Sequence, residues 1–278
     1  RPAATALALA LALQLGAAVP AAAAGINSTA GYENGNSPLN LNLIARYASG
    51  QYNVDGGVME IVAYNQSNDF AYAINGQSGL LAAISLKNLA AGSSVAQLSG
   101  TDIDVKALVE AADSSFRYGD MTSVAVSPDS ATLAAALQAE GYNDAGRVAL
   151  FTCNADGTLT LKGLVETGVQ PDMVTFADND TVLTADEGEP REGYGDGVAD
   201  PRGSVTVVDV SALTSEVVGF DAFDDRRDEL AASGVVLKKG VNPSTDLEPE
   251  YIAVSGGKAY ITLQENNAIA VLDLTSRT

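Results

Sequence analysis

The sequence predicts an all-β fold, a β-propeller of four-stranded antiparallel blades that is present here as an incomplete ring of about four blades. Three observations predict it. Short apolar runs with a period of two residues recur along the chain. Turns rich in Gly, Asn, Asp and Ser separate these runs. The runs also group into four similar repeats, which is typical of propellers. A β-sandwich of similar strands is the alternative.

Residues 1–24 are typical of the remnant of a secretory signal peptide. Arg1 supplies a positive charge, and an Ala/Leu-rich segment runs from Ala4 to Val19 before further small residues. A membrane helix is the competing interpretation, but the segment is short and consists largely of alanine. The sequence therefore predicts a secreted or cell-surface protein, or a periplasmic one, whose mature chain has no transmembrane helix.

A segment with little periodicity, residues 25–55, leads into the fold and contains one short strand at Leu43–Tyr47. The partial propeller domain follows at 56–278, with blades that begin at about residues 56, 119, 169 and 247. The expected first strands are Met59–Tyr64, Thr122–Ser127, Pro171–Phe176 and Pro249–Val254; the second are Phe70–Ile74, Ala131–Leu137, Thr181–Ala185 and Ala259–Leu263. The third are Leu80–Leu86, Arg147–Cys153, Ser204–Val210 and Ala268–Leu274, and fourth strands are expected at Val95–Leu98, Leu159–Leu164 and Glu216–Phe220.

Three insertions interrupt the repeats. Asp102–Tyr118 has apolar spacing that fits a short helix, and a second helix is expected over Asp225–Ser233, where Gly234 would end it. The third insertion is the acidic loop Asp186–Gly203.

Composition excludes several classes of function. The 35 acidic and 15 basic residues give a formal net charge of −20, which disfavours binding to nucleic acid or to anionic membranes. The chain contains no His, so catalytic sites that need one are excluded. It has no Gly-rich phosphate loop, and no nucleotide or organic cofactor is indicated. Cys153 is the only cysteine; it is either a buried small hydrophobic residue or an unpaired thiol, and burial is expected.

Acidic residues occupy equivalent positions in the repeats. Glu60, Asp172 and Glu250 lie at the start of the first strands, and Ser123 has the same position in the second repeat. In a propeller these positions open on the face around the central channel. Three converging carboxylates would suit a hard divalent cation such as Ca²⁺. The alternative is that these residues only form turns and caps between strands.

A second polar layer follows the second strands. Its acidic members, expected to surround the inner carboxylates as further metal ligands, are Asp186, Glu187, Glu189 and Glu265. Its other members are candidate ligand-binding residues: Asn75, Gln138, Arg191, Gln264 and Asn266. The alternative for the densest part is a solvated acidic loop that Arg191 partly neutralises.

Five motifs occur in order along the chain: Val169–Phe176, Ala185–Pro190, Asp200–Val205, Asp246–Tyr251 and Gln264–Val271. Together they resemble the choice-of-anchor I family of secreted bacterial proteins, which is similar to mesenchyme-specific cell-surface glycoproteins. The resemblance extends from about Gly56 to Leu274. It implies a secreted or surface-anchored propeller whose parent protein has a further C-terminal half or anchor. Asp186 departs from the pattern, because relatives often have Asn there.

The expected function is a secreted or cell-surface module that binds a divalent cation or another ligand through its acidic face, with an extracellular matrix or surface component as the expected partner. Some relatives are described as alkaline phosphatase or phytase-like. The resemblance therefore makes a calcium-dependent phosphoesterase acting on extracellular phosphate esters the alternative. A third interpretation is a matrix protein without a specific small ligand.

Overall fold

The computed structural model describes residues 43–54, 57–89, 94–191, 193 and 197–278. The chain divides into two compact units, residues 1–46 with 90–96, and residues 47–89 with 97–278. In the first unit, the Ala96 amide donates a hydrogen bond of 2.9 Å to the Ile44 carbonyl. This bond joins β1 (Ala45–Arg46) to β5 (Ala96–Gln97). The four larger sheets belong to the second unit.

These sheets, called blades 1 to 4, are each built from antiparallel strands in sequence order. Blades 1 to 3 have four strands, and blade 4 has three in the described residues. Blade 1 contains β2 (Met59–Asn65), β3 (Phe70–Asn75), β4 (Leu80–Ser85) and β6 (Gly100–Ile103); blade 2 contains β7 (Tyr118–Val126), β8 (Thr132–Ala139), β9 (Ala145–Cys153) and β10 (Leu159–Val169). Blade 3 contains β11 (Pro171–Phe176), β12 (Thr181–Asp186), β13 (Ser204–Asp209) and β14 (Thr214–Gly219); blade 4 contains β15 (Ile252–Ser255), β16 (Lys258–Leu263) and β17 (Ala268–Asp273).

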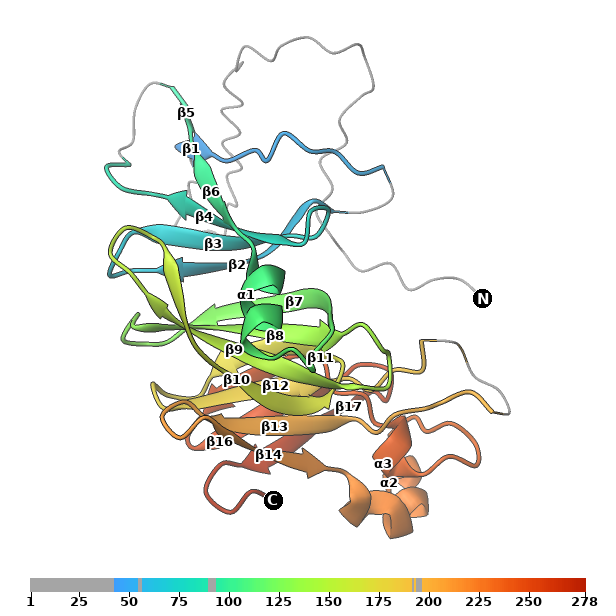
Figure 1. The fold of residues 1–278 in the computed structure, drawn as a ribbon. Helices are drawn as coiled ribbons and strands as arrows, with labels where there is room; N and C mark the ends of the chain where they lie inside the picture. The colour runs from blue at the N-terminus through green and yellow to red at the C-terminus, as the bar shows by residue number, and fades with distance from the viewer. Residues whose placement is uncertain (1–42, 55–56, 90–93, 192, 194–196) are drawn as a thin grey trace, which may run out of the picture. The chain divides into compact units, whose positions relative to one another are not determined.

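The first strands of successive blades lie next to one another. β2 contacts β7, β7 contacts β11, and β11 contacts β15. Figure 1 shows blades 1, 2 and 3 layered in chain order. The contacts between first strands place these strands innermost. This arrangement is that of a β-propeller, and it confirms the fold class expected from the repeats.

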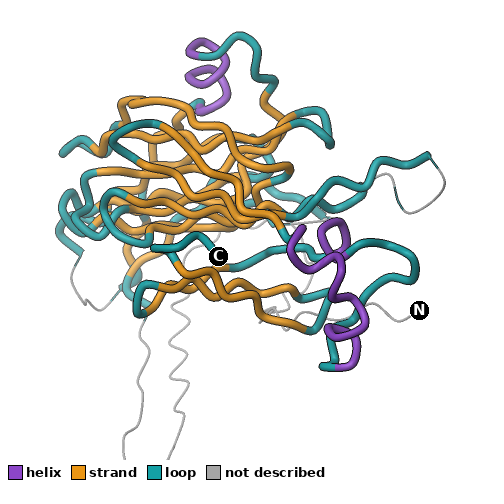
Figure 2. The backbone as a smooth tube through the Cα atoms, turned by 90° about the horizontal axis from the view of Figure 1, so that it is seen from below, coloured by secondary structure: helices purple, strands orange, loops and turns teal. Residues whose placement is uncertain are grey.

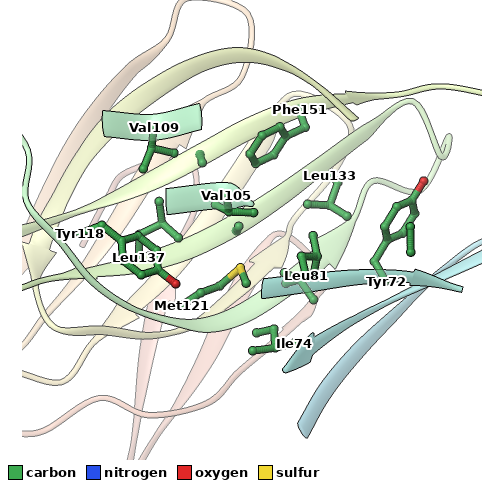
Figure 3. Packing of buried hydrophobic residues seen from close by; sticks show 14 of the residues in the cluster. Tyr72, Ile74, Leu81, Val105, Val109, Tyr118, Met121, Leu133, Leu137 and Phe151 are labelled. Carbon is green, nitrogen blue, oxygen red and sulfur yellow. The ribbon is translucent and has the colours of Figure 1, made fainter. Parts of the chain in front are cut away.

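Apolar clusters fill the spaces between successive blades. Between blades 1 and 2, Tyr72 and Leu81 pack against Leu133 and Phe151, together with other buried residues (Figure 3). Ala134 points the other way, into the cluster that joins blades 2 and 3. Alternate residues of β8 thus face different neighbours, because successive side chains of a strand point to opposite faces. The central strands are apolar on both sides for this reason.

The helices lie outside the strand layers (Figure 2). α1 (Val105–Ala112) follows the N-cap Asp104, whose carboxylate accepts a hydrogen bond of 2.9 Å from the Ala107 amide. Val105 and Val109 of this helix are buried in the cluster between blades 1 and 2. The segment that connects blade 3 to blade 4 in the sequence contains η1 (Asp221–Arg226), α2 (Arg227–Ala232) and α3 (Pro243–Asp246). The two expected helices are thereby confirmed.

The fourth strand of blade 1 was wrongly predicted at Val95–Leu98. β5, within that range, pairs with β1, and β6 is the strand that pairs with β4. The segment Gly100–Ile103 carries only one apolar side chain, so periodicity could not reveal it. A Cβ atom at Gly100 would lie 3.0 Å from the Tyr47 ring, so the ring would have to shift slightly to accommodate it.

Several sequence-based expectations concern residues outside the described ranges. The signal peptide remnant at 1–24 and most of the segment 25–55 lie there. In the part of the chain that is described, no helix has the length and apolar character needed to cross a bilayer. Cys153 is a free thiol that is only partly buried, and burial raises its pKa to about 11.

Candidate functional site

The site is built where the acidic loop leaves β12. The end of β12 and the start of β11 lie side by side at one end of blade 3, because Pro171 pairs with Asp186. Beyond that pair, the Glu187 amide donates to the Gln170 carbonyl at 3.0 Å, and the Gly188 amide donates to the Val169 carbonyl at 3.3 Å. The loop therefore starts by folding back along the end of blade 2.

Gln170 holds the next part of this loop. Its side chain is 3% exposed, and its Nε2 donates to the carbonyl oxygens of Tyr142 at 2.9 Å and Glu189 at 2.8 Å. Its Oε1 accepts from Arg191 Nε at 3.0 Å. Its φ of +56° is in the left-handed region. Gln170 belongs to the motif Val169–Phe176, but the sequence indicated no role for it, because these contacts depend on the folded loop.

Four carboxylates form an acidic cluster here: Asp172, Glu187, Glu189 and Glu250. Burial raises the pKa of Glu187 to about 7, and the charges of Asp172, Glu189 and Glu250 add to this rise. Burial also raises the pKa of Asp172, and Glu189 adds to that effect. The Arg191 charge opposes both shifts. Segments distant in sequence therefore bring these carboxylates within electrostatic reach of one another.

Glu250 connects the cluster to blade 4. Burial raises its pKa to about 7, followed by the charges of Glu265, Asp172 and Glu248. A hydrogen bond from the Gln264 backbone amide opposes this rise. Glu265 thus lies beside the cluster, as the sequence predicted for a second polar layer.

A second group of charges adjoins the cluster. Lys238 Nζ lies 2.9 Å from Glu248 Oε1 and 3.4 Å from Asp246 Oδ1, and the Lys238 amide donates to Asp246 Oδ2 at 2.6 Å. Asp200 also belongs to this group, because the charges of Lys238 and Asp246 act on its pKa, which burial raises. These four residues are called the Lys238 group. Its charge interacts with the acidic cluster, since Glu189 contributes to the raised pKa of Glu248.

Asp186 lies apart from the acidic cluster, although it precedes Glu187. Its side chain is fully buried and accepts hydrogen bonds from Thr184 Oγ1 at 2.7 Å, Ser204 Oγ at 2.9 Å and Thr206 Oγ1 at 2.6 Å. The Gly168 amide of blade 2 also donates to it, at 3.3 Å. Burial raises its pKa to about 6. The carboxylate thus joins blade 2 to blade 3 inside the sheet packing, and its role as a metal ligand stays a prediction.

Glu60 also lies apart from the acidic cluster. Its carboxylate is close to Gly57 and Gly76 of blade 1, where a Cβ atom added to Gly76 would lie 3.5 Å from Glu60 Oε1. The charges that raise the pKa values of Glu187 and Glu250 do not include it. The structure thus brings Asp172 and Glu250 together and leaves Glu60 outside their group.

The predicted amide ligands have different structural roles. Asn75 Oδ1 accepts from the amides of Gln77 and Ser78, both at 3.2 Å. Asn266 is buried, and its Nδ2 donates to the Asp246 carbonyl at 2.8 Å. Gln138 is also buried, and its Nε2 has no hydrogen-bond partner among the described residues.

Two basic side chains oppose the negative charge of this part of the molecule. Arg191 and Lys238 are the basic residues whose charges act on these carboxylates. Yet no three acidic side chains in the described ranges are placed to share one metal ion. With these side-chain positions, a divalent ion would use at most two carboxylates and would need carbonyl oxygens or water as further ligands, as Ca²⁺ accepts.

Comparison with known proteins places the chain in a family. The family model described as Choice-of-anchor I domain matches residues 60–278. No curated protein matches the chain.

Three solved structures are similar to the chain. A putative 6-phosphogluconolactonase from Bacteroides uniformis is 11% identical over 77% of this chain and 50% of that chain, with a TM-score of 0.45. The Cps50 (Swd1) β-propeller domain from Myceliophteria thermophila is 12% identical over 81% of this chain and 55% of that one, with a TM-score of 0.43. Hydrazine synthase of Kuenenia stuttgartiensis is 15% identical over 78% of this chain and 64% of that one, with a TM-score of 0.40. The chain therefore spans between half and two thirds of these three proteins.

Proposed function

This chain belongs to the choice-of-anchor I family, and on that premise we propose that it is a secreted or cell-surface β-propeller module that binds a divalent cation or another positively charged ligand at its acidic cluster. The expected partner, an extracellular matrix or cell-surface component, would either supply that ligand or bind it together with this chain. The family relationship and the propeller fold support a binding module. In a propeller, loops from several blades form one face, and that face can bind a ligand.

One observation carries the proposal. The pKa values of Glu187 and Glu250 are both raised to about 7 at a point where blades 3 and 4 meet. Burial and neighbouring negative charge cause these shifts, so the charged forms are held at a free-energy cost that a bound cation would remove. A ligand that binds only the folded state must also stabilise that state.

Thermal unfolding measures this stabilisation. We expect the melting temperature to rise when Ca²⁺ is added to chelator-treated protein at about pH 8, where Glu187 and Glu250 are charged. Stabilisation amounts to about 2.7 kcal/mol when the ligand concentration is 100 times its dissociation constant. The double variant Glu187→Gln/Glu250→Gln should lose most of the rise.

A charge-matched control separates specific binding from general screening of a protein with a net charge of −20. The double variant Glu140→Gln/Glu216→Gln removes two exposed carboxylates from blades 2 and 3. It should retain the full response. If no cation raises the melting temperature, or if both double variants respond equally, the acidic cluster is not the binding site.

The alternative function, calcium-dependent phosphoesterase, has one observation in its favour. A carboxyl group with a pKa of about 7, as at Glu187, can give and take a proton near neutral pH. Without bound cations, however, the acidic cluster would repel a phosphate group. Hydrolysis of a phosphate ester that needs Ca²⁺ and is abolished by Glu187→Gln, in a variant that still folds, would establish this function. Unchanged hydrolysis in that variant would exclude Glu187 as its proton-transfer group.

A further inference from the structure

The motif Asp200–Val205, which the acidic cluster does not use, forms one wall of a separate cavity. This cavity has a volume of about 520 Å³, within the range of about 300–1,000 Å³ that is usual for small-molecule sites. Residues 199–204 line one side of it, and parts of β10 and β14 line the others. Because β10 and β14 are in contact, the cavity lies where the outer strands of blades 2 and 3 meet. No carboxylate of the acidic cluster is among its described lining residues.

Close packing fixes the wall that the motif forms. Gly203 is buried, and a Cβ atom there would overlap the Leu247 carbonyl oxygen, so the close approach of the two backbones requires glycine. The next residue, Ser204, is also buried and donates a hydrogen bond of 2.9 Å to Asp186 Oδ2. The wall is therefore anchored directly beside Arg202, whose side chain is 60% exposed where the cavity opens to solvent.

The polar side chains of this wall have hydrogen-bonding capacity to spare. Asp200 Oδ1 is buried and accepts no hydrogen bond among the described residues. Arg202 contacts Asp221 through Nη1, which leaves the other guanidinium donors for a ligand. The Asn143 carboxamide adds both a donor and an acceptor. Buried carboxylate oxygens are normally paired, so the unpaired oxygen of Asp200 indicates a ligand that donates a hydrogen bond.

The Asp200 carboxylate is accessible to such a donor. Burial raises its pKa, which the Lys238 charge opposes, but no residue of the described part of the chain supplies the hydrogen bond that Oδ1 lacks. A donor in the cavity can reach this oxygen after a rotation of the carboxylate about χ2, since that torsion has broad energy wells.

The charges of the wall favour a neutral ligand. Asp200 and Asp221 are acidic and Arg202 is basic, so a charged ligand of either sign would meet a like charge. The net charge of −20 repels anions in addition. A hydroxyl group both donates and accepts hydrogen bonds, and it therefore suits all of these side chains without a net charge.

The rest of the wall is apolar. Val169, Pro201 and Val217 line it, and Val217 is 52% exposed. Carboxylate, carboxamide and guanidinium groups each present two polar atoms side by side, the arrangement that bidentate contacts use. A sugar ring combines adjacent hydroxyl groups, which suit those polar groups, with an apolar C–H face, which suits the valines and the proline.

We propose that this cavity binds a neutral saccharide, at a site separate from the acidic cluster. Adjacent hydroxyl groups of one sugar ring donate to Asp200 and accept from Arg202, and a further hydroxyl group binds Asn143. The C–H face of the ring packs on Val217. A free sugar and the terminal unit of a glycan chain share this chemistry. The inference does not depend on the cation binding proposed above.

Ligand-detected NMR and calorimetry on the whole chain test the site. The probes are neutral monosaccharides and trisaccharides of glucose, mannose, galactose and N-acetylglucosamine. We expect at least one sugar type to bind with a dissociation constant of about 1 mM or lower. If its trisaccharide binds about tenfold more tightly than its monosaccharide, a glycan chain is the ligand, whereas equal affinity identifies the free sugar.

Matched variants locate the binding. Arg202→Ala should weaken it about tenfold. Arg226→Ala is the control: it removes another exposed arginine, which pairs with Glu229 at 2.7 Å and does not line the cavity. Ala199→Phe fills the cavity from an exposed position without removing a polar group, and it should abolish binding. Asp200→Asn provides the comparison with Arg226→Ala if the other cavity variants do not fold.

Three results would overturn the inference. The first is that no sugar of the four types binds. The second is that an acidic trisaccharide of glucuronate binds more tightly than every neutral probe, because the charges of the wall would then not select a neutral ligand. The third is equal binding by Arg226→Ala and the cavity variants, which would place the sugar elsewhere on the protein.

Discussion

Arg191 and Gln170 are joined by a hydrogen bond of 3.0 Å from the guanidinium Nε to the side-chain Oε1. Gln170 in turn donates to the backbone carbonyl of Glu189 at 2.8 Å. One buried amide therefore positions both a carboxylate of the acidic cluster and the cation that moderates its charge. The site depends on a residue that carries no charge of its own.

Gln170→Ala should destabilise the protein by about 1–3 kcal/mol, because it leaves buried partners without their hydrogen bonds. It should also reduce the cation-induced rise in melting temperature, since the loop that carries Glu187 and Glu189 loses its anchor. Urea unfolding with and without the cation measures both effects. Gln264→Ala is the control: Gln264 is exposed and contacts Glu250 through its backbone amide, which the substitution retains. Equal losses in the two variants would contradict this role of Gln170.

Stability should rise as the pH is lowered from about 8 to about 5. Burial and nearby charges raise the pKa of both Glu187 and Glu250 from 4.5 to about 7. The folded chain therefore holds these protons more tightly than the unfolded chain, and the contribution is complete below about pH 4.5 and lost as the pH rises through 7. Thermal unfolding in buffers of constant ionic strength measures it, and Glu187→Gln/Glu250→Gln should flatten the rise.

At lower pH the trend should reverse. Aspartates in turns behave oppositely, because hydrogen bonds from the Ser127 side chain lower the pKa of Asp129, and backbone hydrogen bonds lower that of Asp209. Their contribution is present above the usual aspartate pKa of 3.8 and is lost as the pH falls through the lowered values. A melting temperature that is constant between about pH 8 and 5 would contradict the electrostatic description of the cluster.

Asp186→Ala should reduce the free energy of unfolding by about 3 kcal/mol, because it leaves three buried hydroxyl groups without their acceptor. Asp186→Asn should cost less, since the amide keeps the shape and one acceptor oxygen. Chemical denaturation measures both. Glu216→Ala, at an exposed position of β14, serves as the control. Equal stability of Asp186→Ala and the control would show that these hydrogen bonds do not hold blades 2 and 3 together.

Asp186 also shows how much of the site the sequence could predict. Polar residues at the strand ends indicated where carboxylates gather, and the charges of Asp172 and Glu250 act on the pKa of Glu187. Strand alternation, however, sends neighbouring side chains to opposite faces. Thr184 and Asp186 therefore share the face toward blade 2, opposite Leu183 and Ala185. Strand alternation could have been applied to Asp186 from the sequence alone, but its place in an acidic motif favoured the prediction of a metal ligand.

The Lys238 group was beyond sequence reasoning for a different reason. The lysine lies in the irregular segment after α2, and its contacts with Asp246 and Glu248 depend on how that segment returns to blade 4. No periodicity specifies such a path. The blades were more predictable, because the alternation of apolar residues that identifies a strand also determines which blade each side chain faces.

Leu133→Ala should destabilise the protein by about 2–5 kcal/mol, because Leu133 is fully buried between blades 1 and 2 and its removal leaves a cavity. Val217→Ala, at a position that is 52% exposed, should cost less than 1 kcal/mol. Denaturant unfolding of both variants tests whether the packing between blades supplies the stability. The cation response of Leu133→Ala should be unchanged while it remains folded, because Leu133 lies in a different interface from the acidic cluster.

Gly188→Ala should impair both stability and ligand binding. Gly188 has a φ of +65°, and a Cβ atom there would lie 2.7 Å from the Arg202 carbonyl carbon, so the backbone between Glu187 and Glu189 must shift. Gly193→Ala is a matched control in the same loop: its φ is +85°, but a Cβ atom would meet no atom of the described residues within 4 Å. Both variants carry the cost of a positive φ, about 1 kcal/mol. Only Gly188→Ala adds the steric conflict, so it should lose more stability and most of the cation-induced shift. If the two variants lose the cation-induced shift equally, the position of the loop does not determine the geometry of the acidic cluster.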